Sequence, residues 1–390
     1  NGADYNDHPE WSYLNNPYVY VAQYISEFDA YAHPLSAHQE NTGATNASGS
    51  AFRNVENHNW YAAQWSQNYN SGINFDAPKD YWNNGQNKTV VLYEGRYCYL
   101  WTKNFGARVQ GWMAYLNGMR GAAWGGQDTW SFGNTYDEDT TSSDGVDIIT
   151  SDDKTLATWR DSLTYKSTYQ LSYMRSFFEN IVGQWHMLTP RFDDASYFAP
   201  ANDKVFYICA STDDKAKSVV YFYNSSDSSL AQFPNATEEN AVKTGVLGGL
   251  KANSAYNYLW FDPVSGQIHS AGNFVSDSSG KWNVPSKTTR DMVLYVCLAS
   301  ENCVHANKLN FAARSATCEF YGHGAYTLCT DCNKVVSGSA AITALTAHTP
   351  GTAATCIKDG LCSVCSAVLE GRLGHEYESE ITSPDCTANG

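Results

Sequence analysis

The sequence of 390 residues has little positive charge and no long apolar run. Its 25 Lys and Arg residues are outnumbered by 40 Asp and Glu residues, which gives a formal net charge of −15. A field of that sign repels phosphate backbones, so we expect no nucleic-acid partner. No apolar run approaches the roughly 20 residues that span a bilayer, so we expect no membrane span. Only 17% of the residues are charged and 43% are hydrophobic, which excludes a disordered chain.

Cysteine is scarce through the first three hundred residues and concentrated after them. Only Cys98, Cys209 and Cys297 precede the eight cysteines that lie between Cys303 and Cys386. Low Lys content, abundant Ser, Thr, Asn and Gly, and a Cys-rich end together favour a secreted or cell-surface protein. The chain starts at Asn-Gly without Met or a signal peptide, which indicates a processed chain or a piece of a longer one.

Aromatic side chains make up 14% of the residues, with 27 Tyr and 12 Trp. Flat rings of this kind either stack on the faces of sugars or fill a large core. Composition alone leaves both interpretations open.

Residues 1–190 alternate short apolar runs with helical periodicity. The β-branched run Thr89–Tyr93 predicts a strand, and the apolar spacing predicts helices over about 104–120 and 156–181. The small-residue segment 121–124 is able to enter a crowded sheet. This strand–helix alternation predicts parallel βα units.

Residues 191–300 show strand patterns without helical periods. Ser, Asp, Gly and Asn clusters separate the runs, which predicts an antiparallel β-sandwich in which Trp260 is largely buried. The predicted strands cover 204–211, 217–225, 255–262 and 291–299.

Glu94 follows directly on the predicted strand Thr89–Tyr93. Functional groups of βα barrels sit at the carboxyl ends of strands, where the loops open the site. Glu94 is therefore a candidate nucleophile or general acid/base. The alternative is an exposed loop carboxylate or an ion pair with Arg96.

Four segments, in order, carry a family resemblance: FDAYAHPLSAHQ, WYAAQW, VVLYEGRY and GWMAYLNGMRGAAWGGQDTWSF. The chain from about residue 4 to 298 resembles the apiosidase-like (DUF4038-type) glycoside hydrolases of the retaining (β/α)8 clan. The resemblance implies that Pro34–His38, Trp60–Gln64, Thr89–Tyr93 and Gly121–Trp124 are the last four barrel strands.

The resemblance also implies roles for individual residues. Glu94, at the end of the seventh barrel strand, would be the nucleophile. The acid/base of this clan sits at the end of the fourth strand, and Asp4 near the chain start is the candidate for it. In an enzyme of this kind Tyr93, Arg96 or Tyr97 would hold Glu94 ionised, and further polar and aromatic side chains would bind the sugar. These are His33, His38, Gln64, Trp124, Gln127 and Trp130. The alternative is that the His and Trp residues among them are structural.

The first four barrel strands have no counterpart in this sequence. Half of a barrel exposes two strand edges, so we expect the missing N-terminal half, or another chain, as a partner. The sequence therefore predicts a partial (β/α)8 (TIM) barrel at 1–190, an antiparallel β-sandwich at 191–300 and Cys/His-rich repeat modules at 301–390.

Two functions fit these features. The first is a retaining glycoside hydrolase acting on plant or host glycans without a catalytic cofactor. The second is a non-catalytic carbohydrate-binding or structural surface protein on a glycosidase-like scaffold.

The C-terminal region repeats a Cys … Cys-x2-Cys … His unit and resembles the short Cys/His repeats of large surface proteins of gut Firmicutes. Three thiolates and one imidazole complete a tetrahedral zinc site, and so small a unit needs such a staple to fold. Disulfides, across units or through Cys303, are the alternative. The expected structural zinc ligands are, in the first unit, Cys318, Cys329, Cys332 and His348, and in the second Cys356, Cys362, Cys365 and His375.

Overall fold

The computed structural model describes ten ranges of the chain: 17–36, 38–40, 59–64, 76–84, 88–95, 105–126, 163, 166–223, 241–300 and 303–374. The chain divides into two compact units. The first unit comprises Asn1–Asn310 and Thr327–Ser337, and the second comprises Phe311–Tyr326 and Gly338–Gly390. None of the helices in the described ranges is both long and apolar enough to cross a membrane.

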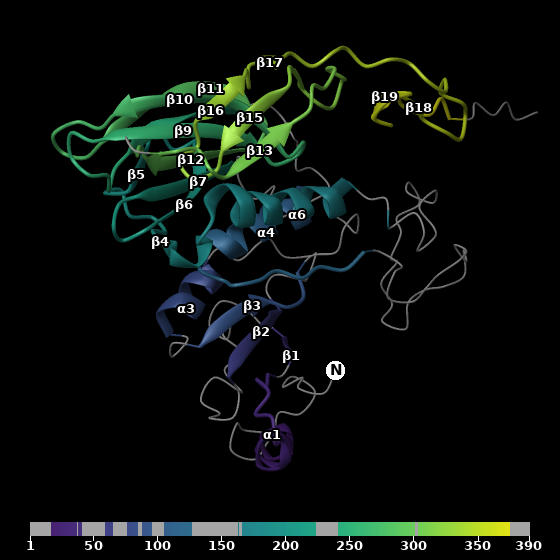
Figure 1. Cartoon of the computed structure of the whole chain (residues 1–390). Coiled ribbons are helices and arrows are strands. Elements are labelled where there is room, and N and C mark those ends of the chain that lie inside the picture. Colours follow the sequence, from purple (N-terminus) through teal and green to yellow (C-terminus); the bar gives the residue numbers. More distant parts are fainter. Residues whose placement is uncertain are drawn as a thin grey trace, which may run out of the picture. The chain divides into compact units, whose positions relative to one another are not determined.

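A small parallel sheet begins the first unit (Figure 1). Its strands are β1 (His38–Glu40), β2 (Trp60–Gln64) and β3 (Thr89–Leu92). β2 pairs in parallel with both β1 and β3, and Leu92 forms a parallel bridge to Ala122. Four chain segments therefore run side by side in the same direction, as the βα pattern predicts.

A strand was expected over Pro34–His38, but the strand β1 begins only at His38. Pro34 has no N–H to donate to a ladder. Side chains take over the pairing: the Ser36 hydroxyl donates to the carbonyl of Trp60 at 2.7 Å and accepts from the N–H of Ala62 at 3.2 Å. The strand was therefore predicted too early in the sequence.

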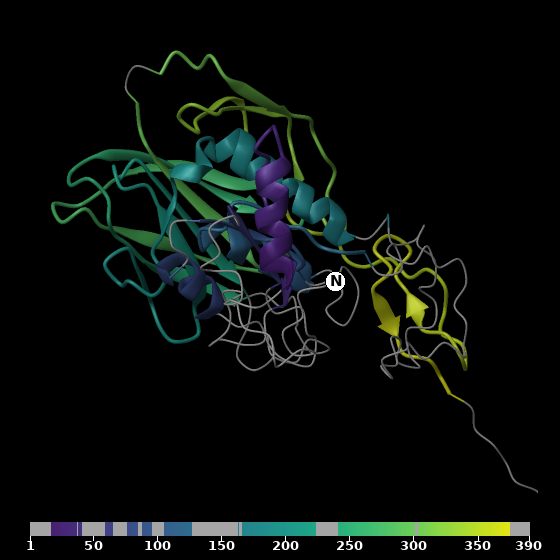
Figure 2. The ribbon, with the colours of Figure 1, turned by 90° about the horizontal axis from the view of Figure 1, so that it is seen from below.

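The described residues of the first unit also form helices. They are α1 (Pro17–Phe28), α3 (Asp76–Asn84), α4 (Phe105–Leu116) and α6 (Lys166–Ser176), the last continuing as the wider turn η1 (Phe177–Val182) before the short η2 (Trp185–Met187). Most side chains of α1 are exposed, and the helix is drawn in purple in Figures 1 and 2. α4 lies between the parallel strands and the larger sheet, and it is buried on every side, as a helix in a middle layer must be. The helix expected over 104–120 is confirmed as α4, and 166–182 confirms the described part of the helix expected over 156–181.

Two antiparallel sheets follow. One has the order β10-β9-β12-β7-β6-β4 and the other the order β11-β8-β5. Their strands are β4 (Thr189–Pro190), β5 (Phe198–Pro200), β6 (Phe206–Ser211), β7 (Lys217–Tyr223), β8 (Ala241–Leu247), β9 (Ala255–Asp262), β10 (Gln267–Val275), β11 (Trp282–Thr289) and β12 (Met292–Leu298). Side chains from both sheets form one core, and Trp260 in it is 2% exposed, as expected. The four strands predicted within 191–300 are confirmed as β6, β7, β9 and β12.

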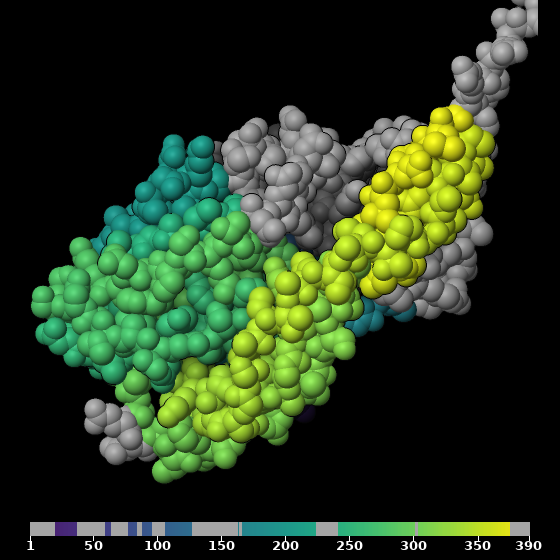
Figure 3. All heavy atoms as spheres, turned by 90° about the horizontal axis from the view of Figure 1, so that it is seen from above, coloured from purple at the N-terminus to yellow at the C-terminus, as the bar shows by residue number. Residues whose placement is uncertain are grey.

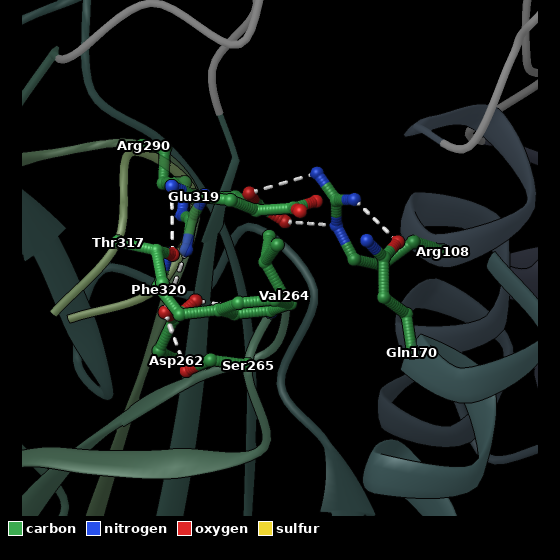
Figure 4. A network of polar contacts seen from close by, with 10 residues as sticks. Arg108, Gln170, Asp262, Val264, Ser265, Arg290, Thr317, Glu319 and Phe320 are labelled. Atoms are coloured by element: carbon green, nitrogen blue, oxygen red, sulfur yellow. Dashed lines mark hydrogen bonds and ion pairs between the residues drawn. The ribbon is translucent and has the colours of Figure 1, made fainter. Parts of the chain in front are cut away.

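A buried ionic network joins the helices to the six-stranded sheet (Figure 4). The Arg108 guanidinium on α4 donates to both carboxylate oxygens of Asp291, at 2.8 and 3.0 Å, and to the side-chain oxygen of Gln170 at 2.6 Å. The Tyr221 hydroxyl donates to the same Asp291 at 2.8 Å. These contacts tie α4, α6 and β7 to the start of β12.

Asp262 organises the turn between β9 and β10. It accepts from the N–H of Val264, the hydroxyl of Ser265 and the guanidinium of Arg290, at 3.0, 2.7 and 2.8 Å (Figure 4). Gly266 completes the turn with a φ of 71°, which a residue with a side chain rarely adopts.

Short strands make up the rest of the described chain. One sheet has the order β13-β15-β16, and two two-stranded pairs follow, β14 with β17 and β18 with β19. Their bounds are β13 (Lys308–Phe311), β14 (Gly322–His323), β15 (Tyr326–Cys329), β16 (Val335–Gly338), β17 (Ile342–Thr343), β18 (Gly360–Leu361) and β19 (Val368–Glu370). β18 and β19 belong to the second unit, and their residues are yellow in Figure 3.

Candidate functional site

Glu94 lies just beyond the carboxyl end of β3 and is half-buried. The N–H groups of Tyr93 and Glu94 both point to the carbonyl of Ala63 in β2, at 2.8 and 3.4 Å. On the other side, the N–H of Gly95 donates to the carbonyl of Ala123 at 2.9 Å. The backbone that carries Glu94 is therefore fixed between two neighbouring parallel segments, at the edge where their carboxyl ends meet.

Gly95 allows the chain to leave the strand at this point. A Cβ atom there would lie 2.8 Å from the side-chain oxygen of Gln110 on α4 and 3.2 Å from the carbonyl of Ala123. A larger residue would therefore require the Gln110 side chain to turn away and the carbonyl of Ala123 to shift by a few tenths of an ångström. The Glu-Gly pair thus combines a carboxylate at the strand end with the close helix packing that holds it.

Aromatic side chains flank Glu94. Tyr93 is 48% exposed, and its ring centroid lies 6.5 Å from that of Trp60 on β2. Trp124, two residues beyond the Leu92–Ala122 bridge, is half-buried. The exposed ring of Tyr93, next to Glu94 in the chain, offers apolar surface of the kind on which a sugar ring stacks.

The other residues predicted for the site divide into three groups. The ring of His33 bonds to Asp29, with its Nδ1 3.0 Å from one carboxylate oxygen, and the N–H of His33 helps to lower the pKa of Asp29. His33 thus has a role in the turn after α1. His38 opens β1 and Gln64 closes β2, and nothing further is described of their side chains. Outside the described residues lie Asp4, Arg96, Gln127 and Trp130.

A first Cys/His cluster lies in the first unit. Its ligand atoms all fall within 4.8 Å of one another, and they belong to Cys303, His305, Cys329 and Cys332. The Sγ atoms of Cys303 and Cys329 are 3.6 Å apart, and Cys332 Sγ is 3.4 Å from His305 Nδ1. A tetrahedral zinc ion with bonds of about 2.3 Å to sulfur and 2.0–2.1 Å to nitrogen requires edges of about 3.8 and 3.5 Å. The cluster therefore has the dimensions of a Cys3His metal site.

A second cluster of the same composition lies in the second unit, formed by Cys318, His348, Cys362 and Cys365. Cys318 and Cys362 Sγ are 3.8 Å apart, and Cys365 Sγ is 3.3 Å from His348 Nδ1. Burial raises the pKa of Cys362, but hydrogen bonds from the N–H groups of Val364 and Cys365 outweigh it and lower that pKa to about 5.

The structure groups the ligands differently from the sequence-based prediction. The predicted unit joined Cys318 and His348 to Cys329 and Cys332, whereas each Cys-x2-Cys pair in fact meets a Cys and a His of an earlier segment. Cys303 and His305, which complete the first cluster, were not predicted as ligands. Their Cys-x-His spacing ahead of the first Cys-x2-Cys was the available signal. Cys356 lies outside both clusters, and His375 lies outside the described residues.

No protein-family model matches this chain, and no curated protein matches it. Among solved structures it is similar to a glycoside hydrolase family 5 protein from Bacteroides vulgatus, with 17% identity and a TM-score of 0.49 over 71% of this chain and 57% of that one. A second structure, described as a glycoside hydrolase, gives 14% identity and a TM-score of 0.45 over 72% and 61%. A Paenibacillus polymyxa xyloglucanase of family 44 gives 10% and 0.34 over 72% and 60%. This chain spans less than two thirds of the length of each.

Proposed function

We propose that this chain carries the C-terminal half of a (β/α)8 barrel of a retaining glycoside hydrolase, with Glu94 as the nucleophile. The observation that carries the proposal is the position of Glu94 at the carboxyl end of β3, held by backbone hydrogen bonds to the ends of both neighbouring parallel segments. In βα barrels this edge is where catalytic groups sit. The two antiparallel sheets with a shared core would form the attached β-sandwich.

In this proposal the Glu94 carboxylate attacks the anomeric carbon and forms a glycosyl ester. A second carboxyl group protonates the departing oxygen and then activates the water that hydrolyses the ester. Asp4, or a residue from an N-terminal half of the barrel, would fill this role at about 5–5.5 Å from Glu94, the separation that retention requires. No cofactor takes part in these steps.

The substrate would be a plant or host glycan. The exposed ring of Tyr93 lies beside Glu94 and supports a sugar ring at this edge. A secreted or cell-surface location fits such a substrate.

Replacing Glu94 with Gln tests the assignment, because the amide keeps the shape and removes the nucleophile. We expect the wild type to release sugar from at least one member of a panel of plant and host glycans, and Glu94→Gln to lose nearly all of that activity. Glu179→Gln, an exposed carboxylate on η1 paired with Arg175, is the matched control and should retain it. Sugar release by Glu94→Gln at the wild-type rate would contradict the assignment.

The alternative is a non-catalytic carbohydrate-binding or structural surface protein on the same scaffold. The acidic charge and the Cys/His-rich C-terminal region favour it. Glycan binding by the wild type without sugar release from any member of the panel would support it over the enzyme.

We also propose that the metal of both Cys/His clusters is zinc. The support is the match between the four measured edges, 3.6, 3.4, 3.8 and 3.3 Å, and those of a tetrahedral Cys3His zinc site. Metal analysis of the protein after mild dialysis tests this: zinc bound to both clusters supports it, and cysteines paired as disulfides without metal would contradict it.

A further inference from the structure

The first Cys/His cluster is attached to the antiparallel sheet behind it. The carbonyl of Cys332 accepts hydrogen bonds from the Asn257 amide on β9 at 2.7 Å and from the Cys297 thiol on β12 at 3.3 Å. The next residue, Asn333, donates its side-chain amide to Cys297 Sγ at 3.2 Å. Cys297, Cys332 and Asn333 are all buried. One half of the cluster therefore rests on two strands of the six-stranded sheet.

The other half of the cluster follows the last strand of that sheet. β12 ends at Leu298, and Cys303 and His305 come shortly after it. Asn307 then binds the turn of the Cys-x2-Cys pair: its side chain donates to Asp331 at 2.7 Å, and its carbonyl accepts from the N–H of Thr330 at 3.0 Å. The exit from β12 and the Cys329–Cys332 turn thus lie against each other.

We propose that zinc in the first cluster is a clamp that fastens the Cys329–Cys332 turn to β9 and β12, so that metal binding stabilises the antiparallel sheets. The inference rests on the proposed zinc and adds what that zinc does. Four ligands from two chain segments close the loop between them, and the free energy of metal binding becomes free energy of folding for everything the ligands hold. The second cluster lies in the other unit, and its metal stabilises that unit alone.

The amide protons at the end of β12 report on the clamp. The N–H of Leu298 donates to Ala216 at 2.7 Å, and that of Ala299 donates to Ala255 at 2.9 Å. Hydrogen–deuterium exchange of the full chain, followed by mass spectrometry, measures how often these bonds open. We expect zinc removal by a chelator to speed exchange at both amides at least about tenfold, and zinc addition to restore the slow rate.

Matched double variants separate the two clusters. Cys303→Ser with His305→Ala should lose about one zinc per chain and reproduce the fast exchange at Leu298 and Ala299. Cys365→Ser with His348→Ala should also lose about one zinc but leave these two amides at the wild-type rate.

Asn257→Ala keeps all four ligands and removes the hydrogen bond from the Asn257 amide to the carbonyl of Cys332. Partners that hydrogen-bond a ligating side chain are worth about 10–100-fold in metal affinity, and because Asn257 holds the backbone of Cys332 instead, we expect a loss of about tenfold, at the lower end of that range. Asn273→Ala, an exposed asparagine opposite Asn257 on β10, is the control and should leave the affinity unchanged. Competition with a chromogenic chelator measures the zinc affinity of both variants, and this test leaves every metal ligand in place.

The outcomes distinguish two failures. If the wild type binds no zinc, the metal proposal fails and the clamp fails with it. If zinc binds but its removal leaves exchange at Leu298 and Ala299 unchanged, or Asn257→Ala binds as tightly as Asn273→Ala, the clamp is overturned and the zinc sites stand.

Discussion

The buried pair Arg108–Asp291 gives the sharpest stability prediction. The side chains are 0% and 1% exposed, and the guanidinium grips the carboxylate through two hydrogen bonds. Arg108→Met keeps most of the apolar stem and removes the charge. Asp291 then stays buried with only the Tyr221 hydroxyl among its described polar partners. Breaking a buried pair from one side costs about 3–5 kcal/mol.

The control is another arginine pair in the same helical region. Arg175 and Glu179 form an i,i+4 pair on the surface, with side chains 72% and 47% exposed. Such pairs contribute about 0.3–0.5 kcal/mol, so Arg175→Met should change stability by less than about 1 kcal/mol. The loss in the free energy of unfolding is thus predicted to be several-fold larger for Arg108→Met than for Arg175→Met, because only the Arg108 pair is buried.

Urea unfolding followed by tryptophan fluorescence measures both variants. Trp112 stacks on Tyr221 with ring centroids 5.5 Å apart, so it reports on this junction directly. A double variant, Arg108→Met with Asp291→Leu, should recover part of the loss, because the carboxylate that Arg108→Met leaves buried without its guanidinium is gone. Equal, small effects of Arg108→Met and Arg175→Met would refute the reasoning.

Two further predictions concern the strand end and the smaller sheet. Gly95→Ala should cost about 1–3 kcal/mol and lower any sugar release, because its Cβ would lie 3.2 Å from the backbone carbonyl of Ala123 and 2.8 Å from the end of the Gln110 side chain, so that both must move; thermal unfolding with an activity assay checks it, and an unchanged protein would contradict it. Burial lowers the pKa of Lys243 from 10.5 to about 8, so between those pH values the unfolded chain binds more protons than the folded one and the free energy of unfolding rises with pH. Urea unfolding at the two ends of this window should show the rise in the wild type and its loss in Lys243→Met; a rise of equal size in both proteins would assign it to other groups.

The strands were predictable where side chains alternate between core and surface or where β-branched residues cluster. β3, β6, β7, β9 and β12 follow that pattern. The first parallel strand was misplaced because Ser36, just before it, meets β2 through two hydrogen bonds of its hydroxyl, which periodicity does not record. The Arg108–Asp291 pair was equally invisible, since an arginine in a helix is normally read as a surface residue.

The metal ligands show the same division between local and long-range information. The residue types and the Cys-x2-Cys spacing predicted Cys/His sites, and six of the eight expected ligands fall in the two clusters. The grouping was not predictable, because tandem units of similar spacing offer each Cys-x2-Cys pair more than one Cys and His. Only the chain path that brings Cys303 and His305 to Cys329 and Cys332 decides between them.

Trapping a covalent sugar on Glu94 tests the proposed catalytic function most directly. A 2-deoxy-2-fluoroglycosyl fluoride suits this test because fluoride leaves without protonation, so labelling does not depend on which residue is the acid/base. With glycosyl groups chosen from the substrates that the panel identifies, we predict that peptide mass spectrometry finds one sugar esterified to Glu94 and none in Glu94→Gln. Labelling of another carboxylate, or of none while the wild type still releases sugar, would contradict the account.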